Sequence, residues 1–173
     1  MLKASSAEQF SVAFPALHRR SYTAAFRLLG VHAPAEEIAQ ETMTRAYLHW
    51  AKIGDAPTGW CVTVAVNLAL DQMRRAERDR RRHRELITLD RSAVADPRTA
   101  ERLDLYAALR QLPRRQRQIV ALRYLGDLTE ADTARSLNVT LGTVKSLCAR
   151  GLATLRKHLT DPIDHEEPTC SNT

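Results

Sequence analysis

The sequence predicts an all-α protein: two small helical domains joined by a flexible linker, the C-terminal one a helix-turn-helix. Ala, Leu and Arg dominate the 173 residues while Gly occurs six times, which favours helix, and no run resembles a strand ladder with hairpin turns. Apolar residues recur at helical spacing, but this pattern stops between residues 85 and 98. We therefore expect one domain over residues 1–84, a linker over 85–98, a second domain over 99–160 and a disordered tail over 161–173.

Positive charge is concentrated in one segment. The formal net charge is +6, and residues 74–84 hold seven arginines against two acidic residues, a local excess of five. Such a patch indicates binding to a polyanion, most often nucleic acid. The competing interpretation is a solvated helix with Arg–Glu pairs.

Several classes of protein are disfavoured. The three cysteines, Cys61, Cys148 and Cys170, are far apart, so we expect no disulfide framework and a cytoplasmic protein. No histidine has a ligand spacing that indicates a metal, and we expect neither metal nor other cofactor. No apolar run is long enough to insert into a membrane, and the N-terminus lacks the apolar core of a signal peptide. No nucleophile with a base and no cluster of metal-ligating carboxylates stands out, so an enzyme is disfavoured.

Helical spacing predicts two helices before residue 54. The first spans residues 6–29 and ends at Gly30, with Pro15 either bending it or delaying its start. The second spans about residues 34–52 and buries Ile38, Met43, Ala46, Tyr47 and Trp50. Its other face carries Glu36, Glu37, Gln40 and Glu41. These acidic residues either stabilise the helix dipole, which charge alone favours, or form a docking face for a partner.

A loop at residues 54–59 precedes a third helix, expected over residues 60–84. Trp60, Asn67 and the arginines that follow are arranged along this helix. They suit single-stranded nucleic acid, with stacking on Trp60 and phosphate contacts from the arginines. Burial of Trp60 in the core and a solvated Asn67 explain the pattern equally well.

The sequence pattern of the C-terminal half predicts four helices. One spans residues 99–111 with Leu103, Tyr106, Ala107 and Leu109 inside, and Pro113 starts the next, which ends near residue 125. A helix over about residues 129–137 with Thr129 as N-cap, a turn over 138–140 and a helix to about residue 159 then form a helix-turn-helix. The last helix exposes Lys145, Ser146, Ala149 and Arg150, a small, polar and basic face that suits the DNA major groove. An ordinary helical hairpin is the alternative.

Three stretches together resemble the extracytoplasmic-function group of the sigma-70 family of bacterial RNA polymerase sigma factors. Residues 34–47 look like the family's polymerase-binding helix, with an acidic pair, Gln-Glu and a following aromatic. Residues 60–75 look like its promoter-opening helix, with Asn-Leu-Ala-Leu-Asp and trailing arginines. Residues 112–155 look like its C-terminal domain, with Leu-Pro, a basic helix and Gly-Thr-Val-Lys-Ser.

The resemblance implies roles for individual residues. A polymerase-binding set would meet the beta-prime clamp helices: Glu37, Gln40 and Glu41. A minus-ten set would open that promoter element, hold its flipped base and contact phosphates, beside the loop 54–59: Trp60, Asn67, Asp71, Arg74 and Arg75. A minus-thirty-five set would face the second element as a duplex: Thr143, Lys145, Ser146 and Arg150.

The resemblance also implies partners: bacterial core RNA polymerase, including its beta flap, promoter DNA and an anti-sigma factor, with the free chain a monomer. Thr63, Thr133, Asn138 and the short loop before Trp60 depart from the family's usual pattern, which leaves the minus-ten sequence open. A stand-alone dimeric helix-turn-helix regulator is the alternative. It would leave residues 34–84 without a role, and no heptad seam for a dimer is visible.

Overall fold

The computed structural model describes residues 6–86 and 105–160, and every regular element in these two ranges is helical. Three long helices form the N-terminal part: α1 (Ser6–Leu29), α2 (His32–Ile53) and α3 (Pro57–Leu86). Residues 105–111 are helical, and α5 (Arg114–Val120), the π-helix η1 (Ala121–Leu125), α6 (Glu130–Leu137) and α7 (Leu141–Thr160) follow. The all-α prediction is confirmed.

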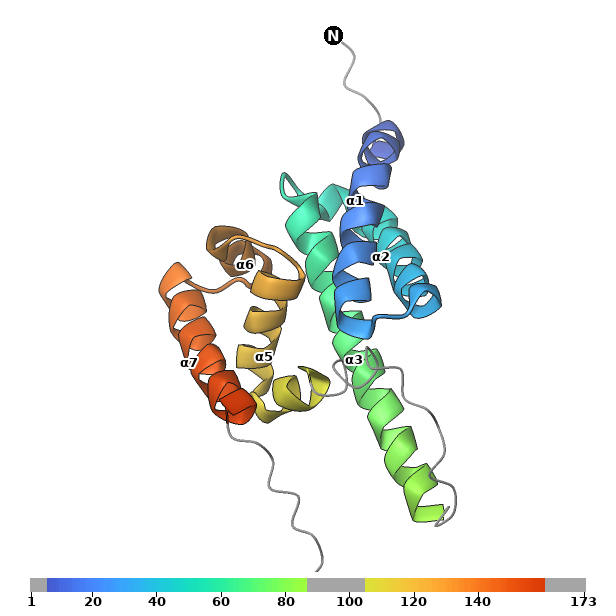
Figure 1. The fold of residues 1–173 in the computed structure, drawn as a ribbon. Coiled ribbons are helices and arrows are strands. Elements are labelled where there is room, and N and C mark those ends of the chain that lie inside the picture. The colour runs from blue at the N-terminus through green and yellow to red at the C-terminus, as the bar shows by residue number, and fades with distance from the viewer. Residues whose placement is uncertain (1–5, 87–104, 161–173) are drawn as a thin grey trace, which may run out of the picture.

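The N-terminal helices pack as a bundle in which α1 contacts both α2 and α3 (Figure 1). Small residues allow this close approach, because Ala24 and Ala25 of α1 and Ala35 and Ala39 of α2 are fully buried. The second half of α3, which carries the arginine-rich segment, extends beyond α1 and α2 (Figure 1). In this part of α3 the described arginines Arg74, Arg75, Arg78 and Arg82 are exposed.

Several boundaries differ from the predicted ones. Helix α1 has the predicted bounds, Ser6–Leu29, and continues through Pro15, which excludes the alternative of a late start. Helix α3 begins at Pro57, at the helix start where proline is tolerated, and shortens the predicted loop 54–59 to residues 54–56. It also includes residues 85 and 86, which we had assigned to the linker. The rest of the predicted linker and the predicted tail lie outside the described residues.

Three side chains lie elsewhere than predicted. Tyr47 is 57% exposed although we had placed it in the core. Ala107 is exposed and its neighbour Ala108 is buried, a shift of one position on the helix. Pro113 caps α5 rather than occupying its first turn, while Leu103 lies outside the described residues.

The helix-turn-helix is built by local capping. Thr129 accepts a hydrogen bond from the Asp132 amide at 3.0 Å and starts α6, and Thr140 accepts one from the Thr143 amide at 3.1 Å and starts α7. Asn138 adopts the left-handed conformation (φ 51°) that ends α6, as predicted. Val144 and Ala134 are buried between the helices with Ile119 and Cys148. The prediction of this motif is confirmed.

One apolar core joins the two halves of the chain. Val62, Ala65 and Val66 of α3 belong to the same buried cluster as Leu109, Val120 and Leu122 of the C-terminal half. Contacts of α3 with η1 and α6, and of α1 with η1, extend this interface. The two predicted domains therefore pack directly against each other in a closed arrangement (Figure 1).

Candidate nucleic-acid interface

The predicted minus-ten residues lie along α3. Trp60, Asn67, Asp71 and Arg74 are separated by seven, four and three residues, intervals that keep side chains on one side of a helix. The structure thus brings these residues onto a single stripe, with Arg75 beside it. The C-terminal end of the stripe is half exposed, and Arg74 forms an ion pair there with Asp71, one helical turn earlier.

Asn67 is engaged by the C-terminal domain. The side-chain amide of Gln118 on α5 donates a 2.9 Å hydrogen bond to Oδ1 of Asn67, in a partly buried position. The oxygen is thereby occupied by a protein donor.

Trp60 faces α6. It packs partly buried against a small core of Leu17, Met43, Ala46 and Cys61. On its other side a cavity of about 130 Å³ separates it from Asp132, Arg135 and Ser136 of α6. Both earlier interpretations of Trp60 are thus compatible with the structure, because the ring contributes to the core and also borders a cavity.

Two glycines permit the close approach of the domains. A Cβ atom added to Gly59 would lie 2.8 Å from Oγ of Ser136, and one added to Gly126 would lie 2.7 Å from Cγ1 of Val62. Distances below 3 Å require the neighbour to move. In the closed arrangement, the N-terminal part of the minus-ten stripe, at Trp60 and Asn67, is therefore covered by η1, α5 and α6.

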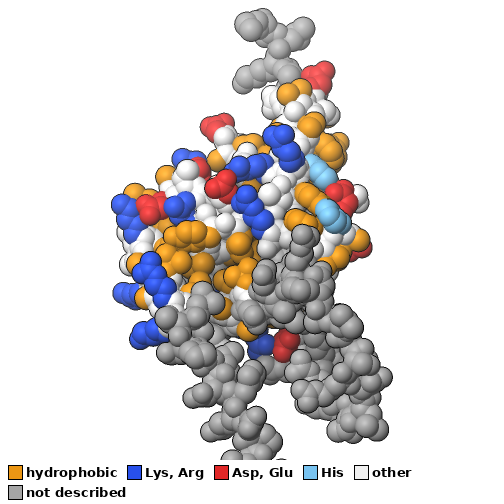
Figure 2. Space-filling view, in the orientation of Figure 1, with side chains coloured by type: hydrophobic (Ala, Val, Ile, Leu, Met, Phe, Trp, Pro, Cys, Tyr) orange, Lys and Arg blue, Asp and Glu red, His pale blue; other side chains and the backbone are white. Residues whose placement is uncertain are grey.

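The predicted minus-thirty-five residues remain open. Lys145, Ser146 and Arg150 are exposed on α7, and Thr143 stands at its N-terminal turn. Nζ of Lys145 lies 3.9 Å from Oε2 of Glu130, a loose surface pair that a phosphate or a base edge can replace at little cost. Lys and Arg side chains gather along the outer edge of the molecule over α7 (Figure 2). The closed arrangement leaves this face accessible.

The predicted polymerase-binding residues share one exposed face of α2. Gln40 donates a 3.1 Å hydrogen bond to Glu36, and Nε of Arg45 pairs with Glu41 at 2.8 Å. Glu37 is exposed on the same side. The face is acidic and polar, and α2 itself packs mainly against α1 and α3.

Helical spacing missed an apolar part of this face, although the resemblance had included the aromatic residue that follows Gln-Glu. Leu48 is 72% exposed, and Tyr47 lines a cavity with Phe10, Phe14 and Gln40. Tyr47 and Leu48 follow Gln40 and Glu41 by seven residues, which is two helical turns. That interval was a signal that could have placed them on the outer side. Large apolar side chains exposed next to charged ones suit a protein partner.

Within the described residues, no group of three or more histidine, cysteine or acidic side chains is arranged to hold a metal ion. None of the helices in residues 6–86 and 105–160 is both long and apolar enough to cross a lipid bilayer.

Comparisons with known proteins match both halves of the chain. Residues 14–79 match the family description "Sigma-70 region 2" and residues 102–155 match "Sigma-70, region 4". The chain is 32% identical to the ECF RNA polymerase sigma factor SigW of Bacillus subtilis over 155 residues, covering 81% of this chain and 83% of SigW. It is 33% identical to the ECF RNA polymerase sigma factor SigL of Mycobacterium tuberculosis over 143 residues, covering 76% and 78%.

Two solved structures share the fold. The first is CnrH in complex with the cytosolic domain of CnrY, with a TM-score of 0.58 and 15% identity, covering 87% of this chain and 86% of that chain. The second is the sigma factor RpoE in complex with the anti-sigma factor NepR from Bartonella quintana, with a TM-score of 0.52 and 24% identity, covering 89% of this chain and 96% of that chain. With the two family regions in order and relatives above 30% identity over most of both chains, this protein belongs to the ECF group of the sigma-70 family of RNA polymerase sigma factors.

Proposed function

We propose that this chain is a dissociable specificity subunit that binds core RNA polymerase and directs it to promoters. The presence of region 2 and region 4 in one chain carries this conclusion, since the stand-alone helix-turn-helix alternative accounts only for the second. The division into residues 1–84, 85–98, 99–160 and 161–173 is part of the proposal. The chain performs no chemistry itself and acts as a monomer in the cytoplasm before it joins the polymerase.

Core polymerase binds the outer face of α2. Glu37, Gln40 and Glu41 supply the polar contacts to the beta-prime clamp helices, and the exposed Tyr47 and Leu48 supply apolar area beside them. Acidic and polar residues around exposed apolar side chains suit a partner helix of basic and apolar character. The beta flap is a second contact, made by the C-terminal domain.

The helix-turn-helix reads the minus-thirty-five element as duplex DNA. Lys145, Ser146 and Arg150 project from α7 without cover, and Thr143 lies where it can contact the backbone. A helix with small, polar and basic side chains enters the major groove without steric conflict.

Minus-ten recognition needs the closed arrangement to open. Trp60 and Asn67 are proposed to hold the flipped base, and Asp71, Arg74 and Arg75 to contact the phosphates. In the closed arrangement, however, Gln118 is hydrogen-bonded to Asn67, and α6 faces Trp60 across a small cavity. Opening DNA disrupts stacking worth about 1.4 kcal/mol per step, whereas one stacked base returns only about 1–3 kcal/mol. The free chain is therefore expected to bind promoter DNA weakly, and specificity to emerge in the holoenzyme.

An anti-sigma factor is a further proposed partner. The solved RpoE structure contains one, and the fold of this chain is similar. A regulator of this kind would act by covering surfaces that polymerase or DNA needs.

Co-elution with core polymerase tests the proposal. The wild-type chain and a Gln40→Ala/Glu41→Ala variant are each mixed with bacterial core enzyme and separated by size exclusion. We expect the wild type to co-elute and the variant to do so less. A control variant, Arg19→Ala, changes an exposed residue of α1 outside this face and should co-elute like the wild type. A free chain that runs as a dimer and ignores the polymerase would instead favour the operator-binding regulator.

A further inference from the structure

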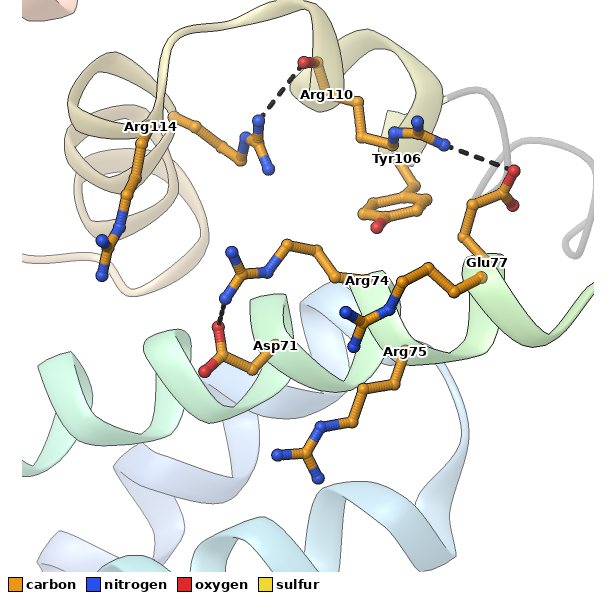
Figure 3. Close-up of a pocket in the computed structure, with 9 residues that line it drawn as sticks. Asp71, Arg74, Arg75, Glu77, Tyr106, Arg110 and Arg114 are labelled. Carbon is orange, nitrogen blue, oxygen red and sulfur yellow. Dashed lines mark hydrogen bonds and ion pairs between the residues drawn. The ribbon is translucent and has the colours of Figure 1, made fainter. Parts of the chain in front are cut away.

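A cavity of about 550 Å³ lies between the C-terminal half of α3 and the helix at residues 105–111 (Figure 3). Its walls carry six arginines and two acidic side chains: Asp71, Arg74, Arg75, Glu77, Arg78, Arg110, Arg114 and Arg117. The arginines come from three separate elements, namely α3, residues 105–111 and α5. This volume is within the range of cavities that bind small molecules.

Ion pairs within the cavity wall neutralise only some of its arginines. Arg74 pairs with Asp71, and Nη1 of Arg110 lies 3.3 Å from Oε1 of Glu77. Among the described residues Arg75, Arg78 and Arg114 have no carboxylate partner at ion-pair distance. The guanidinium of Arg117 donates to the carbonyls of Arg110 and Leu112, at 3.3 and 3.0 Å, and its Nε is buried without a partner. Among the residues that the structure describes, the acidic groups of the cavity wall are therefore outnumbered by its arginines.

Tyr106 supplies an independent sign of a missing ligand. Its side chain is 6% exposed, lines the cavity and points its hydroxyl toward the arginines of α3 (Figure 3). Within the described residues that hydroxyl has no hydrogen-bond partner. Burial raises the pKa of Tyr106 above its ordinary value, so the group stays a neutral O–H donor. Buried donors normally have an acceptor, and an anion in the cavity would be one.

Burial also lowers the pKa of Arg117, because the charged guanidinium is taken out of water among other arginines. A negative ligand between these residues would offset both the desolvation and the mutual repulsion of the arginines. Electrostatics and hydrogen bonding thus favour the same kind of occupant.

We propose that this cavity binds a linear oligophosphate, a chain of three linked phosphate groups, either free or carried by a nucleotide. Guanidinium groups bind phosphate oxygens through paired hydrogen bonds, and arginines spread over three elements match a ligand with several separated anionic groups. One orthophosphate is too small to reach all of these walls. The site does not depend on the proposed function.

The ligand would couple to the arrangement of the domains. Asp71, Arg74 and Arg78 belong to α3 whereas Tyr106, Arg110 and Arg114 belong to the C-terminal half, so separation of the halves takes the site apart. A ligand that binds only the closed arrangement stabilises that arrangement.

Isothermal titration of the free full-length chain tests the site, with inorganic tripolyphosphate, adenosine triphosphate and orthophosphate as probes. We expect one tripolyphosphate per chain and orthophosphate about tenfold weaker or worse. The Tyr106→Phe/Arg114→Gln variant should lose about tenfold in affinity, since it removes a neutral and a charged donor. Arg19→Gln, an exposed arginine outside the cavity, should stay within about twofold. Tighter binding of adenosine triphosphate identifies a nucleotide, and equal binding identifies the phosphate chain alone.

The proposal is overturned if no saturable binding occurs, if Arg19→Gln weakens binding as much as the cavity variant, or if orthophosphate binds as tightly as tripolyphosphate. It is also overturned if a short single-stranded oligonucleotide, and not tripolyphosphate, depends on these residues, because the cavity would then extend the DNA-binding face. Arg114→Gln alone changes an exposed side chain, so it keeps the test valid should the double variant fail to fold. No polymerase is present, so failure here leaves the promoter-specificity function untouched.

Discussion

Gln118 of α5 donates a 2.9 Å hydrogen bond to Asn67 of α3, and this bond links the helix-turn-helix domain to the proposed minus-ten residues. The bond lies at the edge of a shared apolar core that includes Val62, Val66 and Leu122. The face of α7 proposed to bind duplex DNA and the proposed flipped-base site at Asn67 therefore differ in accessibility in the free chain. The first face is open and the second is covered.

Locking the two halves together should block promoter opening. Gly59 and Ser136 approach so closely that a Gly59→Cys/Ser136→Cys pair is expected to form a disulfide between α3 and α6. The oxidised chain should lose promoter opening by the holoenzyme about tenfold or more, measured by permanganate reactivity of the promoter, because Trp60 and Asn67 stay covered. Reduction should restore it. Ser136→Cys alone controls for the substitution, and unchanged opening by a fully oxidised chain would contradict the need for domain separation.

Thr133 is expected to be a weak point of the helix-turn-helix. It is fully buried in α6, and its hydroxyl has no partner among the described residues. Thr133→Val should raise the free energy of unfolding by about 1 kcal/mol, since an unpaired buried hydroxyl is removed at nearly constant shape. Denaturant unfolding measures this.

Thr42 is the matched control, because it is equally buried but donates a 2.7 Å hydrogen bond to the carbonyl of Ile38. Thr42→Val should not stabilise the chain. A Thr133→Val variant less stable than the wild type would mean that the hydroxyl is satisfied in solution.

Lys145 should contribute to minus-thirty-five recognition without affecting polymerase binding. Its only described ion pair is the loose 3.9 Å contact to Glu130, so its removal costs little stability. Lys145→Ala should weaken transcription from a promoter identified with the wild-type holoenzyme by about tenfold, within the 1–3 kcal/mol typical of a DNA contact. Co-elution with core polymerase should be unchanged. Lys157→Ala, exposed further along α7, is the control, and equal losses in both variants would indicate general electrostatic attraction instead.

Cys61 should be chemically inert while the chain is folded. Burial raises the pKa of its thiol to about 12, so at pH 8 only about one molecule in ten thousand carries the reactive thiolate. Alkylation of Cys61 by iodoacetamide at pH 8, followed by peptide mass spectrometry, should be far slower than in guanidinium chloride. Rapid alkylation of the folded chain would show that α3 opens readily around Cys61.

The same shift predicts a loss of stability in alkaline solution. The unfolded thiol ionises near pH 9 while the folded one stays protonated, so unfolding releases a proton between about pH 9 and 12. The contribution of Cys61 to stability is therefore complete below pH 9 and declines as pH rises through this window.

Local signals predicted the helix-turn-helix well. Thr129, Asn138 and Thr140 act within a few residues of their own position, as two caps and a left-handed turn, so their roles follow from side-chain chemistry alone. Helical spacing likewise identified the buried Ile38, Met43 and Ala46. It failed for Tyr47 because an amphipathic pattern does not distinguish an exposed aromatic side chain from one buried in the core.

The closed arrangement could not be predicted from the sequence. The contact between Asn67 and Gln118 joins residues 51 positions apart, and no periodicity encodes which polar side chains meet across two domains. The cavity around Tyr106 and Arg110 depends on the same docking, so nothing in the sequence placed these two residues beside the arginines of α3. Arg74 and Arg75 were expected to contact DNA phosphates, but their position beside arginines of the C-terminal half was not expected.

The close approaches at Gly59 and Gly126 also restrict how such a chain can exchange parts with its relatives. A chimera that joined residues 6–86 to the C-terminal half of another sigma factor would keep both folds but bring new side chains to Ser136 and Gly126. A larger residue at either position would hold the halves apart, and the hybrid would expose Val62 and Val66 to water. The two halves of this chain are therefore matched to each other as well as to polymerase and promoter, and they are inherited most safely as a pair.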